Sequence, residues 1–182
     1  MNDNAKGILT GASLILCFFM FVSAKSQSEN LGDIIVNSIM VLDDGNGGTI
    51  ITFNADGKET AYVGTGEKGG GTIRTSNAEG KETAFLGTGE SGGGSLRSFN
   101  AEGKETAILG TAKNGGGSLL TFNSDGKHTV SLGTNDSGGG SLLTFNKHEA
   151  KTGFFGTNRE NDGMAILSDR YGDVGWTASG KK

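Results

Sequence analysis

The side chains that could carry chemistry recur in short turns, spaced 23 residues apart. The first turn, Asn54-Ala55-Asp56-Gly57, is similar to part of an EF-type calcium loop. Such a loop also needs a carboxylate two residues before the asparagine and a bidentate glutamate at its twelfth position, where this chain has Thr52 and Val63. The spacing therefore favours a structural turn, and we expect no metal site.

Residues for nucleophilic or metal catalysis are sparse. His128 and His148 stand where other copies of the repeat carry Glu or Asp, and Cys17 is the only cysteine. Neighbouring Lys and Glu, as in Lys58-Glu59, cancel each other's charge in solvent and define no cleft that could perturb a pKa. The Gly-rich runs lack the Lys-Ser/Thr of a phosphate loop. We expect no catalytic residue, no cofactor and no enzyme activity.

Aromatic side chains are the remaining candidates for recognition. A phenylalanine precedes most of the turns, although Ser76 replaces it in the second copy, and the last copy contains Tyr171 and the only tryptophan. Each set has two interpretations: packing between units or over the terminal apolar face, or a binding or assembly contact. The candidate contact residues are Phe53, Phe99, Phe122, Phe145, Tyr171 and Trp176.

Apart from Cys17, all these residues belong to a tandem repeat that occupies residues 34–182. Units begin near residues 47, 70, 93, 116, 139 and 163, and Ser38 to Gly48 looks like the second half of a preceding unit. The last unit, at 163–182, is partial and serves as the C-terminal cap, with Asp169 in the Asn position and Gly172 in the turn-glycine position. A fixed period of this length indicates stacked supersecondary units that depend on their neighbours.

Each unit is predicted to be a β-hairpin. In the first unit, strand-like runs at 49–53 and 58–63 flank a turn that begins with Asn and ends with Gly, which is typical of a type I turn closed by a left-handed glycine. The structural turn residues are Asn54, Gly57, Asn77, Gly80, Asn100, Gly103, Asn123 and Gly126. The second connection, 64–71, is expected to be longer and looser. In the fifth unit Glu149 replaces the glycine, so it must adopt a left-handed conformation or the turn must be rebuilt.

The fold class is all-β, with two ways of stacking the hairpins. A β-solenoid would place Lys58 and its equivalents in a like-charge column, whereas an elongated antiparallel meander keeps them further apart, so the turn and the lysines favour the meander. The apolar positions headed by Ile50 and Val63 are predicted to form the core. Trimerisation, with one apolar face per chain buried around a shared axis, remains an alternative.

The N-terminal segment predicts export. Lys6 precedes an apolar stretch from Ile8 to Ala24 that ends in small residues, and a polar linker follows at 25–33. Residues 1–24 therefore form either a cleaved signal peptide or an uncleaved, helical membrane anchor. In both cases we expect the repeats outside the cytoplasm, as an extracellular, cell-surface or periplasmic domain with no membrane contact beyond this segment.

The amino-acid composition limits the classes of partner that the protein is expected to bind. The net charge is −4, with 34 glycines and no proline. Because nucleic-acid surfaces need clustered Lys and Arg, we expect no nucleic-acid partner. Self-association as a homotrimer or filament, or a contact with a cell-surface polymer or glycan, is compatible with the pattern.

The repeat unit also carries a resemblance. Its Asn-x-Asp/Glu-Gly-Lys turn, followed by Thr-Ala-x-Leu-Gly-Thr and Gly-Gly-Gly behind an export segment, resembles the tandem repeats of uncharacterised exported bacterial proteins, over roughly residues 34–175. Its glycine-rich repeat pattern is also similar to that of the β-stalk segments of phage tail fibres. The resemblance implies an exported structural repeat protein, such as a stalk, matrix component or filament subunit, and assigns no catalytic residue. A cell-surface or glycan-binding adhesion module is the alternative.

The turn assignment yields a stability prediction. Gly80→Val and Gly103→Val should each lower the free energy of unfolding by about 1 kcal/mol or more, because valine is forced to φ > 0. Glu82→Gln should have almost no effect. Chemical denaturation of the three variants is the test, and equal, negligible effects would contradict the hairpin assignment.

Overall fold

A computed structural model describes residues 33–42, 45, 47–66, 69–89 and 92–180. Contacts divide the chain into two units, 1–40 and 41–182. The predicted export segment and linker, apart from residue 33, lie outside the described residues. Residues 33–42 form no strand or helix, so the half-unit expected at 38–48 has no strand in its described part. Within the described ranges, no helix has the length and apolar character needed to span a bilayer.

The second unit consists of β-strands of five to seven residues, joined by short turns. The strands are β1 (Thr49–Phe53), β2 (Glu59–Thr65), β3 (Gly71–Ser76), β4 (Glu82–Thr88), β5 (Gly94–Phe99), β6 (Glu105–Thr111), β7 (Gly117–Phe122), β8 (His128–Thr134), β9 (Gly140–Phe145), β10 (Lys151–Thr157), β11 (Gly163–Ser168) and β12 (Val174–Ser179).

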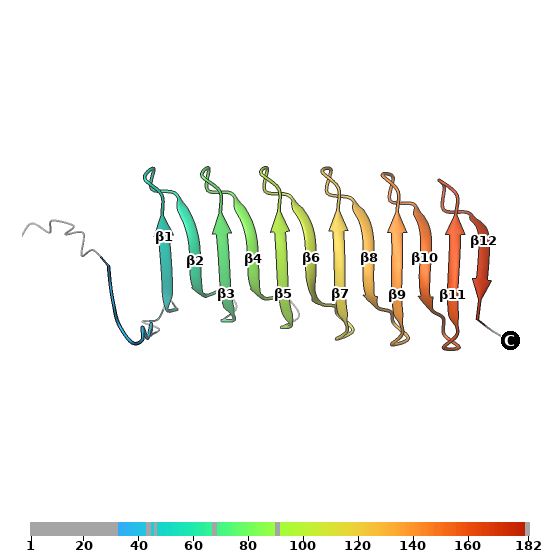
Figure 1. Cartoon of the computed structure of the whole chain (residues 1–182), viewed down its shortest axis with the longest axis horizontal. Coiled ribbons are helices and arrows are strands. Elements are labelled where there is room, and N and C mark those ends of the chain that lie inside the picture. Colours follow the sequence, from blue (N-terminus) through green and yellow to red (C-terminus); the bar gives the residue numbers. More distant parts are fainter. Residues whose placement is uncertain (1–32, 43–44, 46, 67–68, 90–91, 181–182) are drawn as a thin grey trace, which may run out of the picture. The chain divides into compact units, whose positions relative to one another are not determined.

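The strands form one antiparallel sheet in sequence order, from β1 to β12 (Figure 1). Each 23-residue unit supplies one hairpin, so the predicted meander of tandem hairpins is confirmed. β1 and β12 are the two edges and do not pair with each other, so the sheet does not close into a solenoid. The partial last unit is a complete hairpin, β11 and β12.

The turns within the hairpins line one margin of the sheet, drawn at the top of Figure 1, and all but the last begin with asparagine. We call these the asparagine turns and this margin the asparagine margin. In the first, the Asn54 N–H donates to the Lys58 carbonyl at 2.9 Å, and the Gly57 N–H donates to the Asn54 carbonyl at 3.0 Å. The Asn54 side-chain oxygen accepts from the N–H groups of Asp56 and Lys58 at 3.1 and 2.9 Å. Gly57 has φ +73°, and Gly80, Gly103 and Gly126 have φ between +80° and +81°.

The same asparagines also connect successive units. The Asn54 Nδ2 donates to the Ala78 carbonyl of the next turn at 3.2 Å, and the Asn146 Nδ2 donates to the Arg170 carbonyl at 2.8 Å. An amide has both an acceptor oxygen and donor hydrogens. One side chain can therefore close its own turn and bond the turn that follows, which a serine or an ionised aspartate cannot do in the same way.

The opposite margin corrects the expectation of a longer, looser connection. The Gly66 N–H donates to the Gly70 carbonyl and the Gly69 N–H donates to the Gly66 carbonyl, both at 2.8 Å. This is the bonding pattern of the asparagine turns, and Gly69 has φ +79°. In a later copy Asn135 occupies the first position, and its Oδ1 accepts from the Ser137 and Gly139 N–H groups. Both margins therefore use one tight turn.

A β-bulge follows each asparagine turn. Register shifts next to these turns leave Thr60, Thr83, Thr106, Thr129 and Thr152 without a direct partner across the ladder. The hydroxyl of each bulged threonine bonds a hydroxyl on the preceding strand, as between Thr60 and Thr52 at 2.8 Å. The bulge thus explains the threonine that recurs after Lys-Glu, since its hydroxyl bonds at the point where pairing is interrupted.

The positions predicted to form the core lie in one row across one face of the sheet. We call it the leucine row, and its face the leucine face; it consists of Ile50, Val63, Ile73, Leu86, Leu96, Leu109, Leu119, Leu132, Leu142 and Phe155. Ile50 to Leu109 are 44–53% exposed, and no described hydrophobic residue is buried. The core prediction is wrong for the single chain, because a one-layer sheet has no second layer to cover this row.

The left-handed residue of the fifth turn gives a prediction. Glu149 adopts φ 63°, so it accepts the left-handed conformation in an otherwise unchanged turn. Glu149→Gly should raise the free energy of unfolding by about 0.5–1 kcal/mol, because relief of the αL strain exceeds the entropy that glycine adds to the unfolded chain.

Lys147→Gly in the same turn is the control, because Lys147 has no positive φ to relieve. It should leave stability unchanged or lower it. Urea denaturation of both variants measures the difference, and a destabilised Glu149→Gly would show that the side chain matters more than the backbone there.

Candidate interaction surfaces

The face opposite the leucine face, which we call the arginine face, carries a row that changes along the sheet. This arginine row contains Ile51, Tyr62, Arg74, Phe85, Arg97, Ile108, Leu120, Ser131, Leu143, Phe154 and Ile166. Arginines alternate with aromatic rings over β2 to β5. The Arg74 guanidinium lies 4.5 Å from the Tyr62 ring centroid, and that of Arg97 lies 5.6 Å from Phe85. These distances are those of cation–π contacts.

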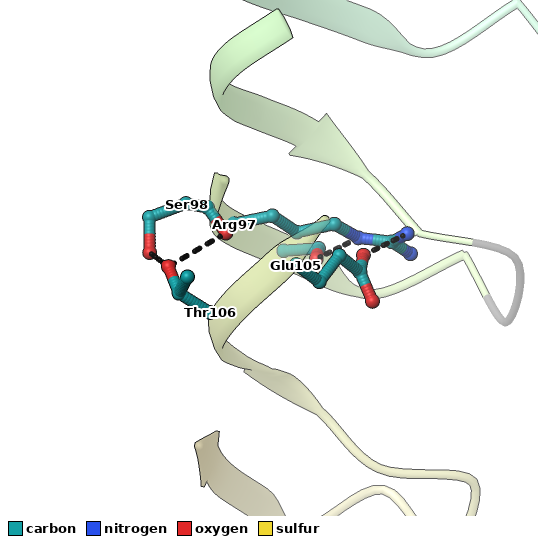
Figure 2. Close-up of polar contacts among 5 residues, drawn as sticks. Arg97, Ser98, Glu105 and Thr106 are labelled. Carbon is teal, nitrogen blue, oxygen red and sulfur yellow. Dashed lines mark hydrogen bonds and ion pairs between the residues drawn. The ribbon is translucent and has the colours of Figure 1, made fainter. Parts of the chain in front are cut away.

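Glutamates neutralise both arginines. Arg97 bonds Glu105 at 3.0 Å and the Ser95 hydroxyl at 3.2 Å, and Arg74 contacts Glu59 at 3.4 Å. Figure 2 shows Arg97 and Glu105 on one side of the strands, and the bonded hydroxyls of Ser98 and Thr106 on the other. A guanidinium already paired with a carboxylate is a poor acid, base or anion ligand. This arrangement offers planar stacking and hydrogen bonding.

A shallow groove of about 510 Å³ follows the arginine row. Tyr62, Arg74, Glu82, Phe85 and Arg97 line it together with glycines of the turns. The Arg74 Nε is buried there without a hydrogen-bond partner. With Glu82 close to the two arginines, the groove has mixed charge, so it suits a neutral, hydroxyl-bearing ligand better than an anion.

Glycines also lie beside the arginine row on alternate strands, where they leave no side chain. An added Cβ would lie 2.8 Å from the Gly71 carbonyl oxygen at Gly87, and 2.9 Å from that of Gly94 at Gly110. These glycines pair with Thr72 and Ser95 across the ladder. Close approach to a neighbouring carbonyl, and not φ, is what requires glycine here.

The four candidate phenylalanines lie on the arginine face, beside the asparagine margin. Phe122 and Phe145 flank His128, with ring centroids 4.7 and 6.3 Å from the imidazole. Phe99 pairs with Glu105 and is half-buried, whereas Phe53 on the edge strand is 62% exposed. The row is interrupted at Ser76, so Phe53 is separated from the other three.

The structure does not bring the C-terminal aromatics to this row. Trp176 lies on the leucine face of edge strand β12, opposite Leu167, and is 53% exposed. Tyr171 lies in the last turn and is 78% exposed. The six candidate residues therefore fall into four separate places and do not form one site.

The charged residues of the strands all lie on the arginine face. From the register and the alternation of side chains, every charged residue of the strands, together with His128, points to that face. These residues are Glu59, Arg74, Glu82, Arg97, Glu105, His128 and Lys151. The leucine face carries none over the described strands. Sequence reasoning missed this division for the glutamates. Arg74 directly follows Ile73 of the leucine row and so points to the opposite face, but Glu59 is four residues before Val63 and reaches the arginine face only because of the bulge at Thr60.

Metal ligands do not gather in the described part of the chain: no group of three or more His, Cys, Asp or Glu side chains is placed to hold an ion. Compared with known protein families and with curated proteins, the chain has no significant match. Its function must therefore be argued from these surfaces.

The glycines beside the arginine row yield a matched prediction. Gly110→Ala should lower the free energy of unfolding by about 1–3 kcal/mol, because the new methyl group must displace a backbone carbonyl. At Gly117 an added Cβ meets nothing within 4 Å, so Gly117→Ala should be neutral or slightly stabilising. Thermal and urea unfolding of both variants checks this, and equal losses would mean that the contact at Gly110 is unimportant.

Proposed function

We propose that this protein is a non-enzymatic, exported structural repeat protein that serves as a surface stalk, matrix component or filament subunit. The observation that carries the proposal is the unclosed meander, in which each hairpin pairs only with its sequence neighbours from β1 to β12. In such a structure, length grows in direct proportion to repeat number, and no residue far away in the sequence is needed to complete a unit.

The bonds between turns support a mechanical role. Asn54, Asn77 and Asn146 each donate to the next turn along the asparagine margin. On the other margin Asn135 donates to the Thr157 carbonyl at 2.9 Å. Hydrogen bonds at both margins, added to the strand ladder, resist bending between neighbouring hairpins. The export part of the proposal rests on the N-terminal sequence, with its apolar stretch from Ile8 to Ala24.

An adhesion module is the second candidate, and it is favoured by the exposed aromatics and the groove. Phe53, Tyr171 and Trp176 are all more than half exposed. The groove along Tyr62 and Phe85 offers aromatic surface beside hydroxyl and carboxylate groups. Such a combination is suited to a glycan, whose rings present both apolar faces and hydroxyls.

Two measurements on the full-length protein separate these functions. Cells that express it should expose the repeats to external protease, and a glycan array should show no saturable binding. The control for binding is Trp176→Phe, which removes the only tryptophan and with it the tryptophan fluorescence. This substitution should not change the array result. Saturable glycan binding with a change in Trp176 fluorescence would support adhesion instead, and repeats protected inside the cytoplasm would contradict export.

A further inference from the structure

The leucine row is the most distinctive surface of the protein that its own fold leaves unused. It runs over ten successive strands, from Ile50 on β1 to Phe155 on β10. The next row on the same face is small, with Ala61, Ala84, Ala107 and Val130 alternating with threonine or serine. A ridge of large aliphatic side chains beside small ones is the shape of a sheet face that packs against another layer.

The row is costly to leave in water. Eight of its ten members are 44–69% exposed, Leu119 and Leu142 are partly exposed, and no described hydrophobic residue of the chain is buried. Sheets in stable domains bury one face against a second layer, at a separation of about 10 Å between two sheets. This chain supplies no second layer among its described residues, so the layer must come from elsewhere.

A second copy of the chain fits the row for three reasons. Its own leucine row has the same spacing and length, because both follow from strand separation and repeat number. The leucine face carries no charged strand residue, so two such faces meet without like-charge repulsion or a buried unpaired ion. The arginine face, which holds every charged strand residue, would meet both penalties if it were buried in the same way.

The area of the row also matches a stable interface. Ten side chains of this size, most of them about half exposed, present on the order of 900 Å² of apolar surface per copy, against roughly 800 Å² per partner in a standard-size interface. Isologous contacts, in which the same surface is used by both partners, are the commonest in homo-oligomers.

We propose that the leucine row is a homotypic interface that packs against the leucine row of a second copy, so that two single-layer sheets become a sandwich with a shared core. The inference deepens the structural function proposed above and rests on it for its biological setting. It names the partner, another copy of this chain, and the face through which the copies assemble.

The test uses adjacent leucines on the same strands that point to opposite faces. Leu119 and Leu142 belong to the leucine row, whereas Leu120 and Leu143 belong to the arginine row. The variant pair is Leu119→Thr with Leu142→Thr, and the matched control is Leu120→Thr with Leu143→Thr. Threonine keeps the strand propensity in both. The full-length chain of each, purified from cells that express it, is measured by sedimentation and light scattering.

We expect the wild type to associate, the leucine-row variant to raise the dissociation constant on the order of 100-fold, and the control to change it only a few-fold. Each single substitution, expected to have roughly a tenfold effect, replaces the double variant if that fails to fold. A wild type that stays monomeric at high micromolar concentration, or equal weakening by both pairs, would overturn the interface.

The test of the leucine-row interface can fail without contradicting the proposed function, and the reverse is also true. A monomeric chain found at the cell surface would remove the interface and leave the structural role intact. Association through the leucine row in a chain kept inside the cytoplasm would support the interface and remove the exported role.

Discussion

The tight turn is the constraint on which the rest of this structure depends. A sheet without a buried core is held by its backbone ladder, and an antiparallel ladder can continue only if each strand reverses direction in register with the last. The four-residue turn with a left-handed final residue performs this reversal at both margins. Where its first residue is asparagine, the side-chain oxygen also accepts from one or, in most turns, two turn N–H groups, and in several turns the amide nitrogen reaches the next turn.

The two faces of the sheet divide the chemistry of the chain. The arginine face concentrates the charged strand residues, and both of its arginines pair with glutamates, as Arg97 does with Glu105. Towards the C-terminal half the arginine row becomes aliphatic, with Leu120 and Leu143 in place of the arginines. The leucine face keeps one character throughout. A face that tolerates such drift is under looser constraint than one that does not, and this difference supports assigning assembly to the leucine face.

Much of the hairpin was predictable because its causes are local. The φ of Gly57 and its equivalents and the strand between each pair of turns follow from residue types within four positions of one another. The left-handed Glu149 was one of two alternatives that the sequence left open, and the structure decided it. The second turn was missed because Gly66-Glu67-Lys68-Gly69 has no asparagine. A later copy has Asn135 at the first position and glycine three residues further along, and this spacing is typical of the same tight turn. The bulged threonines were missed because a register shift is a relation between two strands.

The amino-acid sequence by itself determined the repeat, the turns and the alternation of side chains along each strand, since turn dihedrals and a period of two are properties of a short segment. Tertiary structure decided how those segments are arranged in space. It placed Ile50 and Val63 in one exposed row, paired the arginines with glutamates from other strands and left the sheet unclosed. Whether an apolar side chain is buried depends on which other elements pack against it. The short segment that contains the side chain does not determine this packing.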